Sequence, residues 1–270
     1  MKRKREQRKW RGCEPEKSQA YSFCVRLRRS GLLIYSSMKK SLLLEISVES
    51  VEAAIAAERG GAHRIELCSN SRAGGTTPGA ELLSATRDSV ALPIFSMVRL
   101  RAGNFVYSAV EFEFMKREIA EAKKFGMNGI VLGVLKDGGQ VDVVRTRQLV
   151  ELAGPLPVTF HRAFDECADL RASLDSVIET GAARLLTSGG KRTALEALEL
   201  LNEVVRIAGN RLIVVPGSGL HTGNIREAVL KTGASEFHAG LSSVIANPMN
   251  DLAEFEKEVR KLADALLRCD

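Results

Sequence analysis

Aromatic residues are scarce in this chain, and its cysteines show no pairing pattern. Aromatic side chains make up 5% of the 270 residues, whereas 45% are hydrophobic, so the core is expected to be aliphatic. The cysteines are odd in number and include no CxxC pair; they are Cys13, Cys24, Cys68, Cys167 and Cys269. This argues against a disulfide framework or a structural zinc site and is typical of a reducing cytoplasm.

The first 40 residues lack the features of a secretory signal or a membrane span, because their longest apolar run covers only residues 31–35. They carry a net charge of +10, and residues 41–270 sum to −4. We interpret this segment as a basic, disordered extension, or as sequence upstream of a true start at Met38. No aromatic residues alternate with its charges, so we expect neither a nucleic-acid partner nor a membrane partner.

From residue 41 onward, short apolar strands alternate with helices. The expected strands are 42–47, 63–67, 93–98, 129–134, 158–161, 184–187, 211–215 and 236–239. The expected helices are 50–59, one ending near 88, 110–125, 142–152, 170–180, 193–208, 224–231 and 251–267. Eight such units predict a single α/β domain over 41–270, a TIM (β/α)8 barrel. An open doubly wound sheet is the alternative, but the glycine-rich phosphate loop it would place after the first strand is missing.

Polar and titratable side chains follow the expected strands at their carboxyl ends, where barrels of this kind build their sites. The segment 158–165 runs from a buried strand directly into His161, Arg162 and Asp165. Period-two alternation places Glu66 with Cys68 on one face of the second strand, and Glu45 faces inward from the first. We predict acid–base roles for Glu45, Glu66, His161 and Asp165.

A second set of residues is predicted to bind an anionic substrate. Guanidinium groups form paired hydrogen bonds with carboxylates and phosphates, and the loop after the seventh strand is the usual phosphate position in this fold. The predicted substrate-binding residues are Arg64, Arg99, Arg101, Arg162, Ser188, Gly217 and Gly219. Each has a structural alternative: Arg64 could be a buried counter-ion, and the 216–219 loop a tight turn without a ligand.

The chain resembles the copper homeostasis protein CutC family between residues 43 and 238. The matching motifs are 61–68 (GAHRIELC), 74–78 (GGTTP), 99–105 (RLRAGNF), 159–165 (TFHRAFD), 186–189 (LTSG) and 236–238 (EFH). The resemblance implies a TIM barrel and a cytoplasmic protein that binds copper. Leu100, Ala102 and Asn104 depart from the family pattern, and Ser47 stands where some members carry a second cysteine.

Three functions follow as hypotheses. In the first, the protein binds Cu(I) through soft ligands near the strand ends, namely Cys68, His161 and His238, with Met97 a further candidate. In the second, it is an enzyme acting on a small anionic substrate, although HxH and a strand-end lysine are missing, so no reaction is assigned. The third is a scaffold that functions by forming a homo-oligomer.

Overall fold

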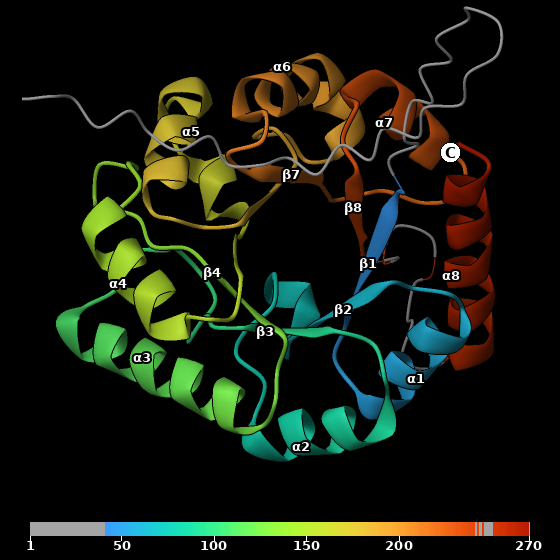
Figure 1. Cartoon of the computed structure of the whole chain (residues 1–270), viewed down its shortest axis with the longest axis horizontal. Helices are drawn as coiled ribbons and strands as arrows, with labels where there is room; N and C mark the ends of the chain where they lie inside the picture. The colour runs from blue at the N-terminus through green and yellow to red at the C-terminus, as the bar shows by residue number, and fades with distance from the viewer. Residues whose placement is uncertain (1–40, 241, 243–244, 246–250, 270) are drawn as a thin grey trace, which may run out of the picture. The chain divides into compact units, whose positions relative to one another are not determined.

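A computed structural model describes residues 41–240, 242, 245 and 251–269, and within them strands and helices alternate (Figure 1). The strands are β1 (Leu43–Val48), β2 (Arg64–Leu67), β3 (Ile94–Met97), β4 (Gly129–Leu132), β5 (Val158–Phe160), β6 (Arg184–Thr187), β7 (Ile213–Pro216) and β8 (Glu236–Ala239). The helices are α1 (Val51–Arg59), α2 (Ala80–Ser89), α3 (Ala109–Lys124), α4 (Val143–Ala153), α5 (Leu170–Glu179), α6 (Leu198–Ala208), α7 (Ile225–Thr232) and α8 (Leu252–Leu267).

The strands form one parallel sheet in the order β7-β6-β5-β4-β3-β2-β1-β8, and β7 contacts β8, so the sheet nearly closes on itself. The helices lie around the outside of the strands (Figure 1). The predicted TIM barrel is therefore confirmed, and the open doubly wound alternative is wrong. Each parallel crossover needs a helix that returns the chain to the same edge, which is why the alternation in the sequence was informative.

Helix starts follow local capping chemistry. The side chains of Ser50 and Asp142 accept hydrogen bonds from the first turns of α1 and α4, and Ser108 forms a capping box with Glu111 at α3. The helix expected over 193–208 is divided into a 3-10 turn (Ala194–Ala197) and α6. The amide of Ala194 donates to the carbonyl of Ser218, which holds this turn against the loop after β7.

The lower interior of the barrel is charged, whereas the sequence led us to expect an aliphatic layer there. Arg64 and Arg184 begin β2 and β6, and both donate to Glu236 at the start of β8, at 2.7 and 3.0 Å. The two guanidinium carbons lie 4.7 and 5.2 Å from the ring centroid of Phe95. Arg64 also pairs with Glu45 of β1. Buried cations are thus neutralised by carboxylates and by an aromatic face.

Gly129 is required where β4 packs against Phe95. A Cβ on Gly129 would lie 2.6 Å from three ring carbons of Phe95, a ring held between two arginines. Gly129→Ala is expected to lower the free energy of unfolding by about 1–3 kcal/mol through overpacking, measured by urea denaturation. Gly79→Ala is the control, because its Cβ would meet nothing within 4 Å. Equal stability of the two variants would contradict this account of the barrel interior.

The predicted basic extension over residues 1–40, including the start proposed at Met38, lies outside the described residues. Across the part of the chain that the structure describes, no helix combines the length and the apolar character that crossing a bilayer requires.

Candidate functional site

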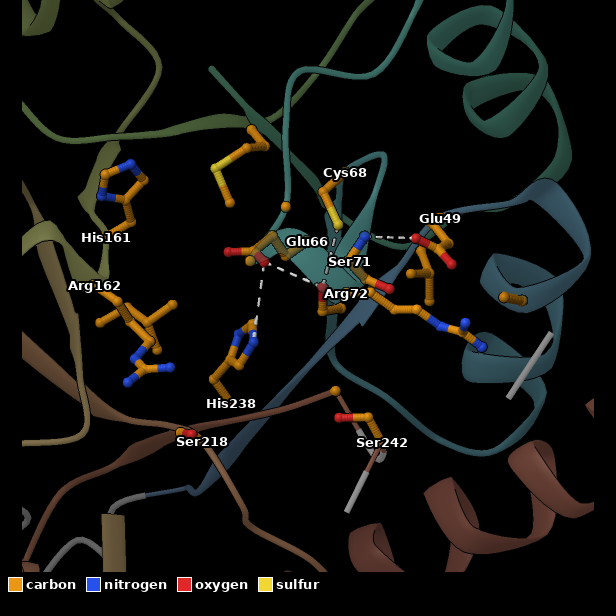
Figure 2. Close-up of a pocket in the computed structure, with 18 of the residues that line it drawn as sticks. Glu49, Glu66, Cys68, Ser71, Arg72, His161, Arg162, Ser218, His238 and Ser242 are labelled. Carbon is orange, nitrogen blue, oxygen red and sulfur yellow. Dashed lines mark hydrogen bonds and ion pairs between the residues drawn. The ribbon is translucent and has the colours of Figure 1, made fainter. Parts of the chain in front are cut away.

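A cavity of about 440 Å³ opens at the carboxyl ends of the strands (Figure 2). Residues from β2, the start of the β5 loop and β8 reach into it, among them Glu66, Cys68, His161, Arg162 and His238. The volume is within the range of small-molecule sites. The predicted site residues divide into those that line this cavity and those that hold loops together.

Glu45, His238 and Glu66 form a buried row across β1, β8 and β2. Nδ1 of His238 lies 2.8 Å from Oε1 of Glu45, and its Nε2 lies 4.0 Å from Oε1 of Glu66. The other oxygen of Glu45 accepts from Arg64. Oε2 of Glu66 has no hydrogen-bond partner among the described residues although it is buried. Glu66 is therefore the carboxylate of this row that retains an uncommitted oxygen.

Burial and charge set the protonation of this row. Burial alone would raise the pKa of Glu45, but the hydrogen bond from His238 and the charge of Arg64 lower it to about 2. Burial raises the pKa of Glu66, against the opposing charge of His238. Burial would lower the pKa of His238, but the charges of Glu66 and Glu45 raise it. The row thus places His238 between two carboxyl groups whose charges favour its protonated form.

The folded protein should lose stability in acid through Glu45. Its pKa is lowered from 4.5 to about 2, so its contribution to stability is present above pH 4.5 and is lost as the pH falls toward 2. The raised pKa of His238 acts in the opposite sense: that contribution is present below its ordinary value of 6.5 and is lost as the pH rises through the folded-state pKa. In urea titrations between about pH 7 and pH 3, Glu45→Gln is expected to show a shallower acid loss than wild type. If the free energy of unfolding of both proteins fell equally with decreasing pH, this role of Glu45 would be refuted.

The same three residues bring potential metal ligands within 4.8 Å of one another. Nδ1 of His238 is hydrogen-bonded to Glu45, the contact that a metal-binding histidine makes through its other ring nitrogen, and Nε2 lies 4.0 Å from Oε1 of Glu66 without a hydrogen bond. Carboxylates are hard ligands that suit Cu(I) poorly. The row could therefore hold a harder metal ion, and it is the two carboxylates, not the contacts of His238, that argue against Cu(I) here.

Cys68 and Met97 form a second, softer group in the cavity. A Cβ built on Gly75 would lie 3.5 Å from Sγ of Cys68 and 3.3 Å from the terminal methyl carbon of Met97, so both side chains pack against Gly75 in one buried cluster. The hydroxyl of Ser47 lies 3.6 Å from Sγ of Cys68 and donates to Glu66 at 3.2 Å. Burial and the charge of Glu66 raise the pKa of Cys68 to about 12. The resting group is therefore a thiol beside a thioether.

His161 is a neutral hydrogen-bond donor. Its Nδ1 accepts from the amide of Ala163 at 3.2 Å, which leaves the proton on Nε2. Burial and the charge of Arg99 lower its pKa to about 3. Nε2 has no hydrogen-bond partner among the described residues. A copper ligand would need Nε2 without its proton, so the contacts of His161 argue against the predicted metal role and against a role as general base.

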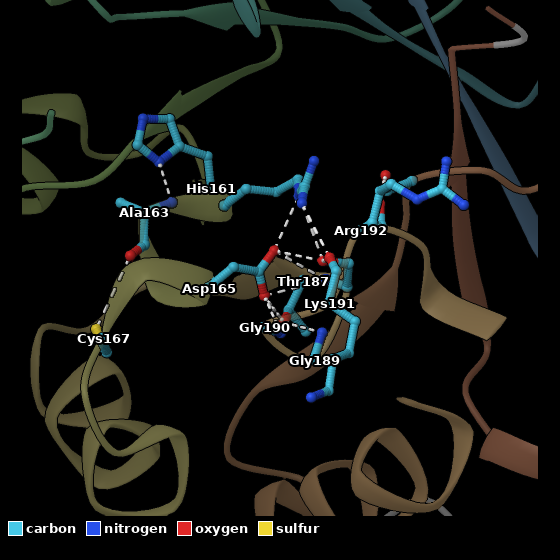
Figure 3. Close-up of polar contacts among 12 residues, drawn as sticks. His161, Ala163, Asp165, Cys167, Thr187, Gly189, Gly190, Lys191 and Arg192 are labelled. Atoms are coloured by element: carbon cyan, nitrogen blue, oxygen red, sulfur yellow. Dashed lines mark hydrogen bonds and ion pairs between the residues drawn. The ribbon is translucent and has the colours of Figure 1, made fainter. Parts of the chain in front are cut away.

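Asp165 is fully engaged rather than free to act as an acid or base. It accepts from Thr187, from the amides of Ser188 and Gly190, and from Arg162, as Figure 3 shows. The hydroxyl of Ser188 donates to the same carboxylate at 2.9 Å. Asp165 therefore joins the loops after β5 and β6, and the catalytic role predicted for it does not agree with these contacts.

The two arginines of the β3 loop are also occupied. Arg99 donates to the carbonyls of Ala73, Gly75 and Gly103 at 2.8–3.0 Å and joins two loops. Arg101 pairs with Glu111 at 2.6 Å at the start of α3. Neither lines the main cavity. The predicted substrate contacts of both arginines, and of Arg64, are replaced by hydrogen bonds within the barrel.

The glycines of the β7 loop permit close packing at the edge of the cavity. A Cβ on Gly217 would lie 2.6 Å from Leu186 and 3.2 Å from Cβ of His238. Gly219 has φ +70° and lines the cavity itself.

The sequence interpretation missed Arg184 and Glu236, which complete the buried ion cluster. Their position as first residues of β6 and β8 was the available signal.

A family model described as the CutC family matches residues 42–243. The mouse copper homeostasis protein cutC homolog is 45% identical over 201 residues, 74% of each chain, and the human homolog is 44% identical over the same length. A family protein CutC from Chromobacterium violaceum is 44% identical over 207 residues, 77% of this chain and 84% of that protein.

Solved structures agree with these matches. The crystal structure of the putative copper homeostasis protein CutC from Streptococcus agalactiae superposes with a TM-score of 0.70 and 28% identity, covering 73% of this chain and 98% of that one. Thiamine phosphate pyrophosphorylase from Pyrococcus furiosus, at a TM-score of 0.56 and 17% identity over 85% of this chain and 97% of that one, shares the fold alone. The chain belongs to the CutC family.

Proposed function

We propose that this protein binds Cu(I) in copper homeostasis and that it acts in the cytoplasm. The observation that supports copper binding is the pair of sulfur side chains, Cys68 and Met97, beside Gly75 in the cavity. Thiolate and thioether sulfur are the protein ligands that Cu(I) prefers. The names of the mammalian relatives point to the same metal.

Copper binding at this pair must release the proton of Cys68, because a metal binds the thiolate. The pKa of the thiol is raised to about 12, so protons compete with Cu(I) at neutral pH. The apparent affinity should therefore increase as the pH rises. Ser47, which holds the thiol from the other side, supplies only a hydroxyl where a second thiol would strengthen the site.

Titration of the whole chain with Cu(I) against a competing chelator, under reducing and anaerobic conditions, tests this function. We expect equimolar binding tighter than micromolar. Micromolar or weaker binding that does not depend on Cys68 would refute it.

A second candidate function is catalysis on a small anionic substrate, and a separate observation favours it. Glu66 is buried, has an uncommitted oxygen and faces His238 in a cavity large enough for an organic molecule. Such a carboxyl group could exchange a proton with a bound substrate. A thermal-shift panel of small phosphates, carboxylates and sugar acids tests this candidate, and the absence of any stabilising compound would count against it.

A further inference from the structure

We propose that Arg162 binds the anionic group, a carboxylate or a phosphate, of a small organic ligand in the cavity. This inference rests on the second function above and does not involve copper. Figure 2 shows the side chain of Arg162 across the cavity from Cys68, with its guanidinium turned toward His238. The position alone does not identify a ligand, but three further features of the surroundings do.

The guanidinium of Arg162 is held in one orientation before any ligand binds. Its Nε donates to Asp165 at 2.8 Å, and its Nη2 donates to the hydroxyl of Ser188 at 3.0 Å. Asp165 is itself fixed by the amides of Ser188 and Gly190 (Figure 3). A side chain ordered in this way loses little conformational entropy when an anion binds. Asp165 thus serves as the positioning residue for Arg162.

One nitrogen of this guanidinium remains available. Nε and Nη2 are engaged, whereas Nη1 makes no hydrogen bond with any residue that the structure describes, and the side chain is 43% exposed. Nη1 presents N–H donors in the plane of the guanidinium, the geometry that binds carboxylate and phosphate oxygens. Both Nη atoms of Arg99 donate to loop carbonyls and, among the described residues, only its buried Nε lacks a partner, whereas Arg101 is engaged by Glu111 and by loop carbonyls.

Two residues that line the same cavity, after β7, have backbone amides without a partner in the described part of the chain. Ser218 and Gly219 follow β7 and have φ values of +77° and +70°. Their amides make no hydrogen bond within the described ranges, and the hydroxyl of Ser218 is turned to the carbonyl of Arg192 at 2.7 Å. Successive free amides of this kind stabilise bound anions. The positive φ of Ser218 would then serve to present these amides to the anion.

The opposite wall orients the ligand. Glu49 and Glu66 line the cavity on the far side, where carboxylates would repel an anion. An anionic group at Arg162 therefore leaves the hydroxyl or carbonyl end of the ligand toward Glu66 and His238. Arg72 also lines the cavity, but it is exposed and no hydrogen bond to a described residue fixes it. Arg72 is therefore a suitable control, because it brings a positive charge to the cavity but its guanidinium is not held in one orientation.

The test is titration of the full chain with inorganic phosphate and, separately, with acetate, followed by calorimetry and thermal unfolding. Arg162→Gln is expected to weaken binding of the preferred anion by about tenfold or more, since a hydrogen bond to a charged group is lost. Arg162→Lys should recover part of the affinity, because it keeps the charge without the planar group. Arg72→Gln should have a clearly smaller effect. Thermal unfolding without anion shows whether each variant folds. If Arg162→Gln does not fold, the affinity of Arg162→Lys is compared with that of wild type instead.

Each outcome decides the inference. Binding of phosphate, of acetate or of both that depends on Arg162 supports it and identifies the anionic group. Anion binding that is insensitive to Arg162, or equally sensitive to Arg72, overturns it. Failure of both anions to bind also overturns it, and stabilisation by a neutral compound in the metabolite panel would then leave the catalytic function standing. If no compound of the panel stabilised the protein either, both the role of Arg162 and the catalytic function would be refuted.

Discussion

Replacing Cys68 by serine is expected to weaken Cu(I) binding by about 100-fold or more, because loss of a ligand should cost at least as much as loss of the groups around one. The sulfur of Cys68 lines the cavity beside Met97, and no second thiol accompanies it, since Ser47 occupies the adjacent position. Serine keeps the size of the side chain and its contact with Ser47 but offers a hard oxygen in place of sulfur. Chelator competition with Cu(I) measures the change.

Two variants make this result specific. Cys269→Ser removes a partly exposed cysteine after α8 and should leave the affinity unchanged. Met97→Leu removes the thioether while keeping the volume, and it should weaken binding less than Cys68→Ser, because a thioether is a neutral ligand. Equal affinities for wild type and Cys68→Ser would mean that copper binds elsewhere or not specifically.

The largest stability effect is expected at Arg64. Arg64→Met removes the cation between Glu45 and Glu236 and leaves a buried carboxylate beside His238 alone, with Arg184 still paired to Glu236. Breaking a buried pair on one side costs about 3–5 kcal/mol in the free energy of unfolding. Urea denaturation at neutral pH measures this loss.

Arg171→Met is the matched control, because Arg171 also pairs with a glutamate, Glu203, at 2.6 Å, but with its side chain 64% exposed. Exposed pairs contribute about 0–1 kcal/mol. If both variants lost the same small amount, the cluster of Arg64 would not stabilise the barrel as its burial implies. A double variant that also carries Glu45→Gln should lose less than the sum of the two single changes, since it removes the uncompensated charge.

The barrel could be predicted from the sequence because its signals are local. Eight strands alternate with eight helices in the described residues, side chains cap the starts of five of those helices, and parallel connectivity follows from the alternation. The alternation of faces also held for the site: Ser47 pairs with Glu66 in register, and Glu45 lies opposite Arg64. These placements need only the period of a strand.

The roles of single residues could not be predicted in the same way. Asp165 and Arg99 follow strands and look like site residues, but their partners are backbone groups of loops distant in the sequence. Whether His161 donates or accepts depends on one contact with the amide of Ala163. Arg162 keeps an exposed Nη1 without a partner among the described residues, whereas both Nη atoms of Arg99 donate to loop carbonyls. Such differences arise from the tertiary arrangement of loops, for which sequence periodicity carries no signal.

The proposed function places copper at Cys68 and Met97 and not at the row of Glu45, His238 and Glu66. X-ray absorption spectroscopy of the Cu(I)-loaded chain distinguishes the two sites, because sulfur scatters differently from oxygen or nitrogen. We predict a sulfur-dominated first shell that loses sulfur in Cys68→Ser. A first shell of oxygen and nitrogen alone, unchanged in Cys68→Ser, would contradict the account.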